Sequence, residues 1–137
     1  MLERTGDQVK FFGALTIIIK LNTEGSALSE DDARQLLLSL IGWFTRSLTD
    51  GSGAIVIRKL ASALVTFFIH FSQLWPDCVH HLLYCLDVGS AVTRDEAKNA
   101  PTSELIASLD EARLLAVIWF ITVFVEEIAK TEMKSQK

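Results

Sequence analysis

Three side chains in one apolar stretch have the chemistry to bind a metal ion. If the stretch is helical, Cys78, His81 and Cys85 share one face, because residues three, four and seven positions apart lie on the same side. Zinc takes thiolate and imidazole ligands in a tetrahedral site, so a fourth ligand would be needed, and the C-x-x-C spacing of zinc modules is missing. Packed helices more commonly use cysteine as a small apolar residue. We therefore predict no metal and no cofactor.

The two cysteines also bear on the redox environment of the chain. Cys78 and Cys85 are seven residues apart, which in a helix puts their Cα atoms roughly 10 Å from one another. A disulfide needs Cα atoms within about 7 Å, so the pair is expected to be reduced. Reduced thiols are typical of the cytosol and the nucleus. The N-terminus is charged before any apolar run begins, which is unlike a secretory signal.

The patterns of catalytic sites are missing from the sequence. A Cys–His mechanism at 78–85 would need an orienting group and an oxyanion site, and neither can be identified. There is no P-loop, no glycine-rich turn after a strand and no serine elbow. The turn at 50–53, Asp-Gly-Ser-Gly, lacks the lysine that phosphate binding requires. We predict that the protein is not an enzyme.

The elements that carry these residues are expected to be helices joined by polar turns. Capping patterns mark several starts: Asp7 as an N-cap, Ser29 with Asp32 as a capping box, and Ser108 with Glu111 as a second one. Pro76 suits the first position of a helix, after a break at 75–76. The predicted helices cover 7–22, 29–48, 54–74, 76–87 and 108–130, with a charged surface loop at about 89–102.

Apolar residues surround the later helices on most faces. The helix at 29–48 is amphipathic, whereas 54–74 and the centre of 108–130 are apolar nearly all round, so these helices must be covered on several sides. Ala14 and Ala63 stand at equivalent places in two similar runs, 49 residues apart, close to the ~40–47 of HEAT and armadillo repeats. Stacked helical hairpins explain both features. We expect the chain to be a segment of a longer array.

Charge and hydropathy exclude two classes of partner. The 137 residues carry a net charge of −4 and form no basic stripe, so we predict no nucleic-acid binding. The most membrane-like segment, 114–125, has twelve residues where about 20 are needed to span a bilayer. We predict no membrane insertion.

Three motifs, in order, resemble helices of importin-β-type nuclear transport receptors (karyopherins). Residues 8–15, Gln-Val-Lys-Phe-Phe-Gly-Ala-Leu, are similar to the outer helix of the second HEAT repeat in that family. Residues 58–64, followed by Trp75-Pro76, are similar to the third outer helix and the break after it. Residues 114–127, an apolar run ending in two glutamates, resemble the inner helix of the third repeat. The spacing over about 8–130 is most similar to the importin-thirteen and transportin-SR group.

This resemblance implies an all-α superhelix of HEAT-like antiparallel helical hairpins, about two repeats within 1–137. It also implies partners: the small GTPase Ran in its GTP form, a cargo protein, and nucleoporins. The protein would then be found in both the cytoplasm and the nucleus. Transferred residue by residue, the partner-binding positions are Gln35, Ser39, Gly42, Trp43, Arg46, Glu126, Glu127 and Lys130.

The residue types at these positions fit a binding surface. Gly42 would let a partner approach the backbone, and tryptophan and arginine, as at Trp43 and Arg46, are favoured at binding hot spots. The alternative is a solvated helix edge with Trp43 half-buried between repeats. Two other functions remain open: a HEAT or armadillo adaptor unrelated to transport, and a stand-alone helical bundle that dimerises through its last two helices.

Overall fold

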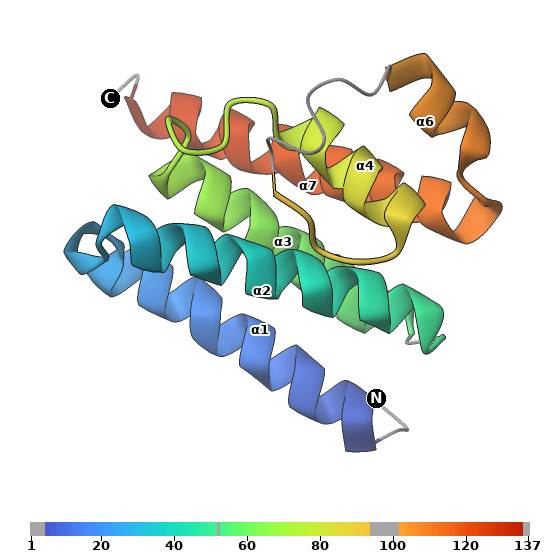
Figure 1. Cartoon of the computed structure of the whole chain (residues 1–137). Coiled ribbons are helices and arrows are strands. Elements are labelled where there is room, and N and C mark those ends of the chain that lie inside the picture. The colour runs from blue at the N-terminus through green and yellow to red at the C-terminus, as the bar shows by residue number, and fades with distance from the viewer. Residues whose placement is uncertain (1–4, 52, 94–101, 136–137) are drawn as a thin grey trace.

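Helices account for nearly all of the structure. The computed structural model describes residues 5–51, 53–93 and 102–135, and within these ranges it contains no strand. The predicted all-α class is confirmed. In chain order the elements are α1 (Thr5–Glu24), the 3-10 turn η1 (Gly25–Ala27), α2 (Glu30–Thr49), α3 (Ala54–His70), α4 (Cys78–Val88), α6 (Thr102–Ser108) and α7 (Glu111–Ser135), as Figure 1 shows.

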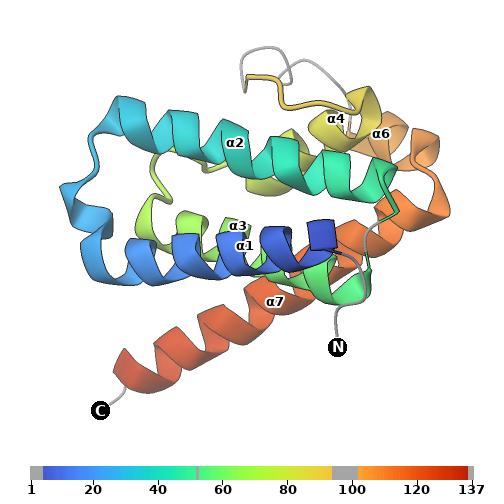
Figure 2. The same cartoon turned by 90° about the horizontal axis from the view of Figure 1, so that it is seen from below.

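Alternate helices lie in the same layer. The most extensive packing is between α1 and α3 and between α3 and α7, while α2 packs on α3 from a second layer that also holds α4. In Figures 1 and 2, α1, α3 and α7 run in one direction and α2 and α4 in the opposite one. Parallel neighbours within a layer arise when antiparallel hairpins stack side by side. The predicted arrangement of HEAT-like hairpins is therefore confirmed, with α1–α2 and α3–α4 as two successive units.

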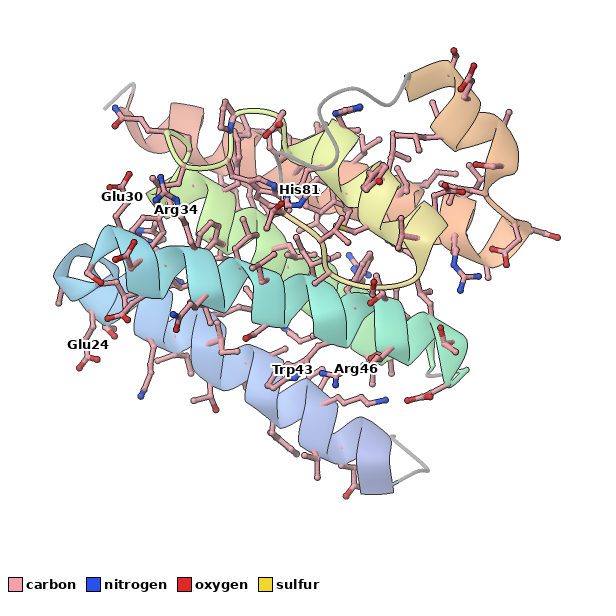
Figure 3. The ribbon with its side chains drawn as sticks, viewed as in Figure 1. Glu24, Glu30, Arg34, Trp43, Arg46 and His81 are labelled. Carbon is pink, nitrogen blue, oxygen red and sulfur yellow. The ribbon has the colours of Figure 1, made fainter. Side chains whose placement is uncertain are left out.

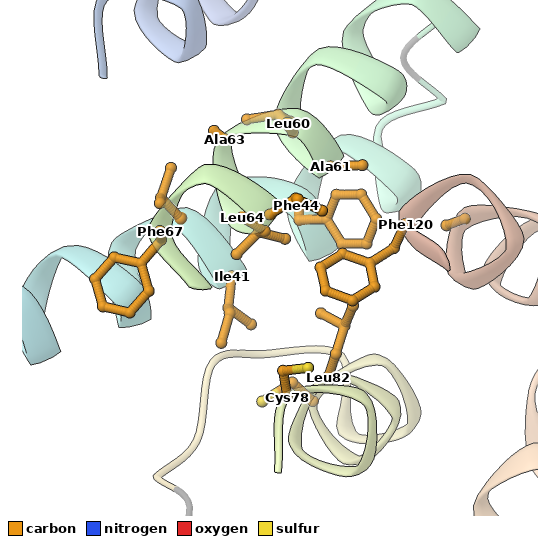
Figure 4. Close-up of a cluster of buried hydrophobic side chains, with 14 of the residues drawn as sticks. Ile41, Phe44, Leu60, Ala61, Ala63, Leu64, Phe67, Cys78, Leu82 and Phe120 are labelled. Atoms are coloured by element: carbon orange, nitrogen blue, oxygen red, sulfur yellow. The ribbon is translucent and has the colours of Figure 1, made fainter. Parts of the chain in front are cut away.

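The core lies between the layers and is centred on α3. Small residues let α1 and α3 approach closely, since Ala14 and Ala63 are both completely buried. A close-up of the core shows buried side chains from α2, α3, α4 and α7 gathered around α3 (Figure 4). The fully or almost fully buried members of this group are Ile41, Phe44, Leu60, Leu64, Phe67, Leu82 and Phe120.

Two of the three predicted N-caps are wrong. The Ser29 hydroxyl accepts a hydrogen bond from the backbone N–H of Asp32 (3.1 Å), as predicted, and α2 begins at the next residue. Asp7, by contrast, lies inside α1. The cap of α7 is Asp110, whose carboxylate accepts from the backbone N–H of Arg113 (2.9 Å), because Ser108 belongs to the end of the unpredicted helix α6.

The third helix is shorter than predicted. It ends at His70 rather than near 74, and α4 begins at Cys78, two residues after Pro76. The turn between them lets Trp75 fold back into the core, where it is fully buried and packs edge-on against Phe67 with ring centroids 6.2 Å apart. Burying so large an aromatic side chain outweighs the loss of one further turn of helix.

The predicted surface loop at 89–102 is described only in part. Gly89 ends α4 in the left-handed conformation (φ 88°), which glycine adopts without a steric cost. Residues 94–101 lie outside the described residues, and Thr102 already belongs to α6. Among the described helices, none has the length and apolarity that crossing a bilayer requires.

The Ser29 cap gives a direct test of how α2 begins. Replacing Ser29 with alanine removes the acceptor for the Asp32 N–H, and we expect a loss of about 1 kcal/mol in the free energy of unfolding, measured by urea denaturation. Ser29→Asp should keep most of the stability, since aspartate also caps. The exposed Ser90 provides the matched control. A loss as large for Ser90→Ala as for Ser29→Ala would contradict the assignment.

Candidate functional site

The predicted partner-binding residues of α2 form one continuous surface, here called the α2 edge: Gln35, Ser39, Gly42, Trp43 and Arg46. Gln35, Ser39 and Arg46 are exposed, while Gly42 and Trp43 are half-buried. Figure 3 shows Trp43 and Arg46 on the side of α2 that faces α1. The spacing of these residues places them on one side of a helix, so local structure alone brings them together.

Trp43 owes its position to a glycine on α1. A Cβ atom at Gly13 would lie 3.3 Å from the indole of Trp43, which is closer than side chains normally pack. Because Gly13 has no side chain, the edge of the indole ring can approach α1 closely. Trp43 is half-buried, but it lies between α1 and α2 of one hairpin rather than between repeats, and part of its ring remains exposed.

The backbone of Gly42 already has close neighbours. Its carbonyl accepts hydrogen bonds from Thr45 Oγ1 (3.0 Å) and from Arg46 Nε (3.3 Å). A Cβ atom at Gly42 would stand 3.9 Å from Ala91, an ordinary contact. A partner would thus meet Ala91 beside Gly42, and the carbonyl bond holds the Arg46 side chain along the helix surface.

Two open hollows flank the Trp43–Arg46 pair. The first, of about 350 Å³, lies between α1 and α2 and is bordered by Val9 and by the ion pair between Lys10 and Asp50 (3.2 Å). The second, of about 290 Å³, lies between α2 and residues 89–91. Each volume accommodates one or a few side chains of a partner, so the α2 edge is a ridge between two recesses.

The predicted residues on α7 are not part of this surface. Glu126 and Lys130 are exposed, and Lys130 forms an ion pair with Glu127 (3.3 Å), an exposed contact of small energetic value. α7 packs beside α3, in the layer of α1 and not in that of α2. The α2 and α7 groups lie in different layers, as Figure 2 shows.

A buried hydrogen-bonded cluster occupies the place where a metal was considered. Trp75 Nε1–H donates to His81 Nδ1 (2.9 Å), so the ring proton of His81 resides on Nε2 and is donated to the carbonyl of Val92 (2.6 Å). Cys85 Sγ also contacts the Val92 carbonyl (3.6 Å) and accepts from the Val92 N–H (3.5 Å). Both nitrogens of His81 are thus engaged within the protein.

This cluster ties three segments together rather than forming a metal site. It connects α4 to the turn before it, through Trp75, and to the segment after it, through Val92. Within the described residues, no three side chains of histidine, cysteine or acidic type are arranged to hold a metal ion. Sequence patterns missed the cluster because no local rule joins Trp75 to His81 or to Val92.

Cys78 lies apart from the cluster, among apolar side chains (Figure 4). Both cysteines are free and buried. Burial raises the pKa of the Cys78 thiol from its ordinary value of 9.0, so this thiol stays protonated at neutral pH. A protonated, buried thiol is a poor nucleophile and a poor metal ligand.

Comparison of the chain with models of protein families, with curated proteins and with solved structures found no match.

The hydrogen bonds of His81 can be tested by removing them. Replacement with phenylalanine leaves the buried indole N–H of Trp75 and the carbonyl of Val92 without this partner, and we expect a loss on the order of 2–4 kcal/mol in the free energy of unfolding. Adding Trp75→Phe to this variant should cost less than it does in the wild type, because the two side chains share one bond. Strictly additive losses, measured by urea denaturation, would contradict the bond.

Proposed function

We propose that the chain is part of a nuclear transport receptor of the importin-β superfamily and that it binds protein partners without chemistry of its own. In this proposal the α2 edge contacts Ran in its GTP form, and a cargo protein and nucleoporins bind elsewhere on the receptor. The protein would shuttle between the cytoplasm and the nucleus. A HEAT or armadillo adaptor unrelated to transport is the competing function, and the experiment below separates the two.

The observation that carries the proposal is that the half-buried Trp43 and the exposed Arg46 line the same two hollows on the α2 edge. The indole of Trp43 packs beside Gly13, and the Gly42 carbonyl accepts a hydrogen bond from the guanidinium of Arg46. Both side chains are therefore already restricted, and partner binding costs them little conformational entropy. Tryptophan and arginine are the residue types that most often dominate binding energy. The resemblance of residues 8–15 and 58–64 to receptor helices supports Ran as that partner.

The chemistry of the ridge describes the partner surface. Beside Arg46, the Lys10 ammonium pairs with Asp50, so the charges of these two side chains balance each other. The guanidinium of Arg46 therefore gives this end of the α2 edge a positive charge. We infer that the partner offers a carboxylate to Arg46 and an apolar side chain to each recess beside Trp43. A bidentate arginine–carboxylate pair would fix the orientation of the complex.

The test is the affinity of the 137-residue chain for Ran in its two nucleotide states. We expect binding to Ran loaded with a non-hydrolysable GTP analogue, at least about tenfold tighter than to Ran–GDP, measured by biolayer interferometry. Equal binding of the two states, or binding of neither, would contradict the transport function and favour an unrelated adaptor.

The α2 edge itself is tested by charge reversal within the same helix. Arg46→Glu should weaken binding of Ran–GTP by about tenfold or more, because it opposes the partner carboxylate. Arg34→Glu is the matched control, since Arg34 is also exposed on α2 but lies about 120° around the helix from Arg46. If both reversals weaken binding equally, the α2 edge is not the contact surface.

A further inference from the structure

The outer side of α1 carries an apolar stripe, here called the α1 stripe: Val9, Phe12, Thr16 and Ile19. Its three apolar members are each more than half exposed. The hydroxyl of Thr16 donates to the carbonyl of Phe12 (2.8 Å), so this residue satisfies its own polar group within the helix. Steps of three, four and three residues keep the stripe on one side of α1, away from the Phe11 ring that meets Lys59 of α3.

The outer side of α7 carries a second stripe, the α7 stripe: Leu115, Ile118, Thr122 and Val125. Its three apolar members are also more than half exposed, and Ile121 beside them is exposed as well. The opposite side of α7 faces α3, where Phe124 packs on Phe68 with ring centroids 5.0 Å apart. The α7 stripe therefore lies on the far side of the layer from the α1 stripe.

The two stripes match in spacing and in residue type. Both have apolar side chains at their first, second and fourth positions and a threonine at the third, with the same steps of three, four and three residues. The residue after each stripe is charged, and the charges are opposite: Lys20 on α1 and Glu126 on α7, both exposed. A parallel pairing of the stripes brings these charges to the same end of the seam, which favours that direction.

The layer already contains this type of contact twice. α1 and α7 each run parallel to α3 and pack against one of its sides. A further helix on the outer side of α7 would continue the layer if it ran in the same direction and presented apolar residues at steps of three and four. The α1 stripe meets both requirements.

We propose that the α7 stripe of one copy of this chain binds the α1 stripe of a second copy, so that α1 of the second copy extends the α1–α3–α7 layer of the first. The contact joins two different surfaces, so in a pair of copies the α1 stripe of the first and the α7 stripe of the second remain exposed. The wild-type protein therefore forms open chains of copies whose mean length increases with concentration. The contact uses neither Trp43 nor Arg46, although Val9 of the α1 stripe also borders the first hollow beside them.

The experiment combines two variants that each lose one stripe. In Phe12→Glu the α1 stripe is disrupted, and in Ile118→Glu the α7 stripe is disrupted. Light scattering coupled to size exclusion should give a mass that rises with concentration for the wild type and a constant monomer mass for either variant alone. An equimolar mixture should form a dimer of twice the monomer mass and nothing larger, because only one functional pair of stripes remains in it.

Controls separate loss of the contact from loss of the fold. Circular dichroism must show wild-type helicity for each variant, and Ile19→Glu with Val125→Glu provides a second pair for the same mixing test. Val88→Glu, an exposed apolar position on α4, should associate as the wild type does.

Three outcomes would overturn the proposal. The first is a wild-type protein that remains monomeric up to its solubility limit, which would mean that a second copy does not bind the stripes. The second is a dimer that Ile118→Glu abolishes but Phe12→Glu leaves intact, which indicates α7 against α7. The third is a mixture of the two variants that stays monomeric.

Discussion

The packing of α3 against helices on both of its sides is the interaction on which the rest of the structure depends. The buried residues of α3 cover more than half of its circumference, so no single neighbour can remove them from water. α1 and α7 cover the two sides and α2 covers the face toward the second layer. Because α3 must be reached from both sides by parallel helices, the chain has to alternate between layers, and antiparallel hairpins result.

The same constraint determines what is available for binding. In the layer of α1, α3 and α7, α1 and α7 each have one side that does not contact α3. The exposed apolar residues of the two helices lie on these outer sides. The α2 edge is exposed for a different reason, since only one face of α2 is needed to cover α3. Rigid helices thus present a polar ridge with one tryptophan on one surface and apolar stripes on two others, and binding surfaces of these two kinds suit different partners.

Sequence patterns predicted what local rules determine. The cap at Ser29 and the apolar face of α2 follow from neighbours within one turn, and both agree with the structure. Sequence patterns failed to predict the structure where contacts between residues far apart in the chain determine it. Trp75 leaves the helical path because of Phe67 and His81, and α6 was missed because only one residue of so short a helix, Leu105, is buried. The layer of α7 could not be inferred from its composition, which suits either layer.

The direction of α7 relative to α1 tests the account most directly. Spin labels at the exposed positions Glu24 and Ala129 report on the two C-terminal ends, and labels at Glu24 and the exposed Ala112 report on opposite ends. Cys78 and Cys85 are replaced by alanine so that only the introduced positions are labelled, and the labelled protein is diluted in unlabelled protein. Pulsed electron–electron double resonance then measures both distances. Parallel helices predict that the Glu24–Ala112 distance exceeds the Glu24–Ala129 distance by on the order of 10 Å. The reverse order would contradict the stacked hairpins.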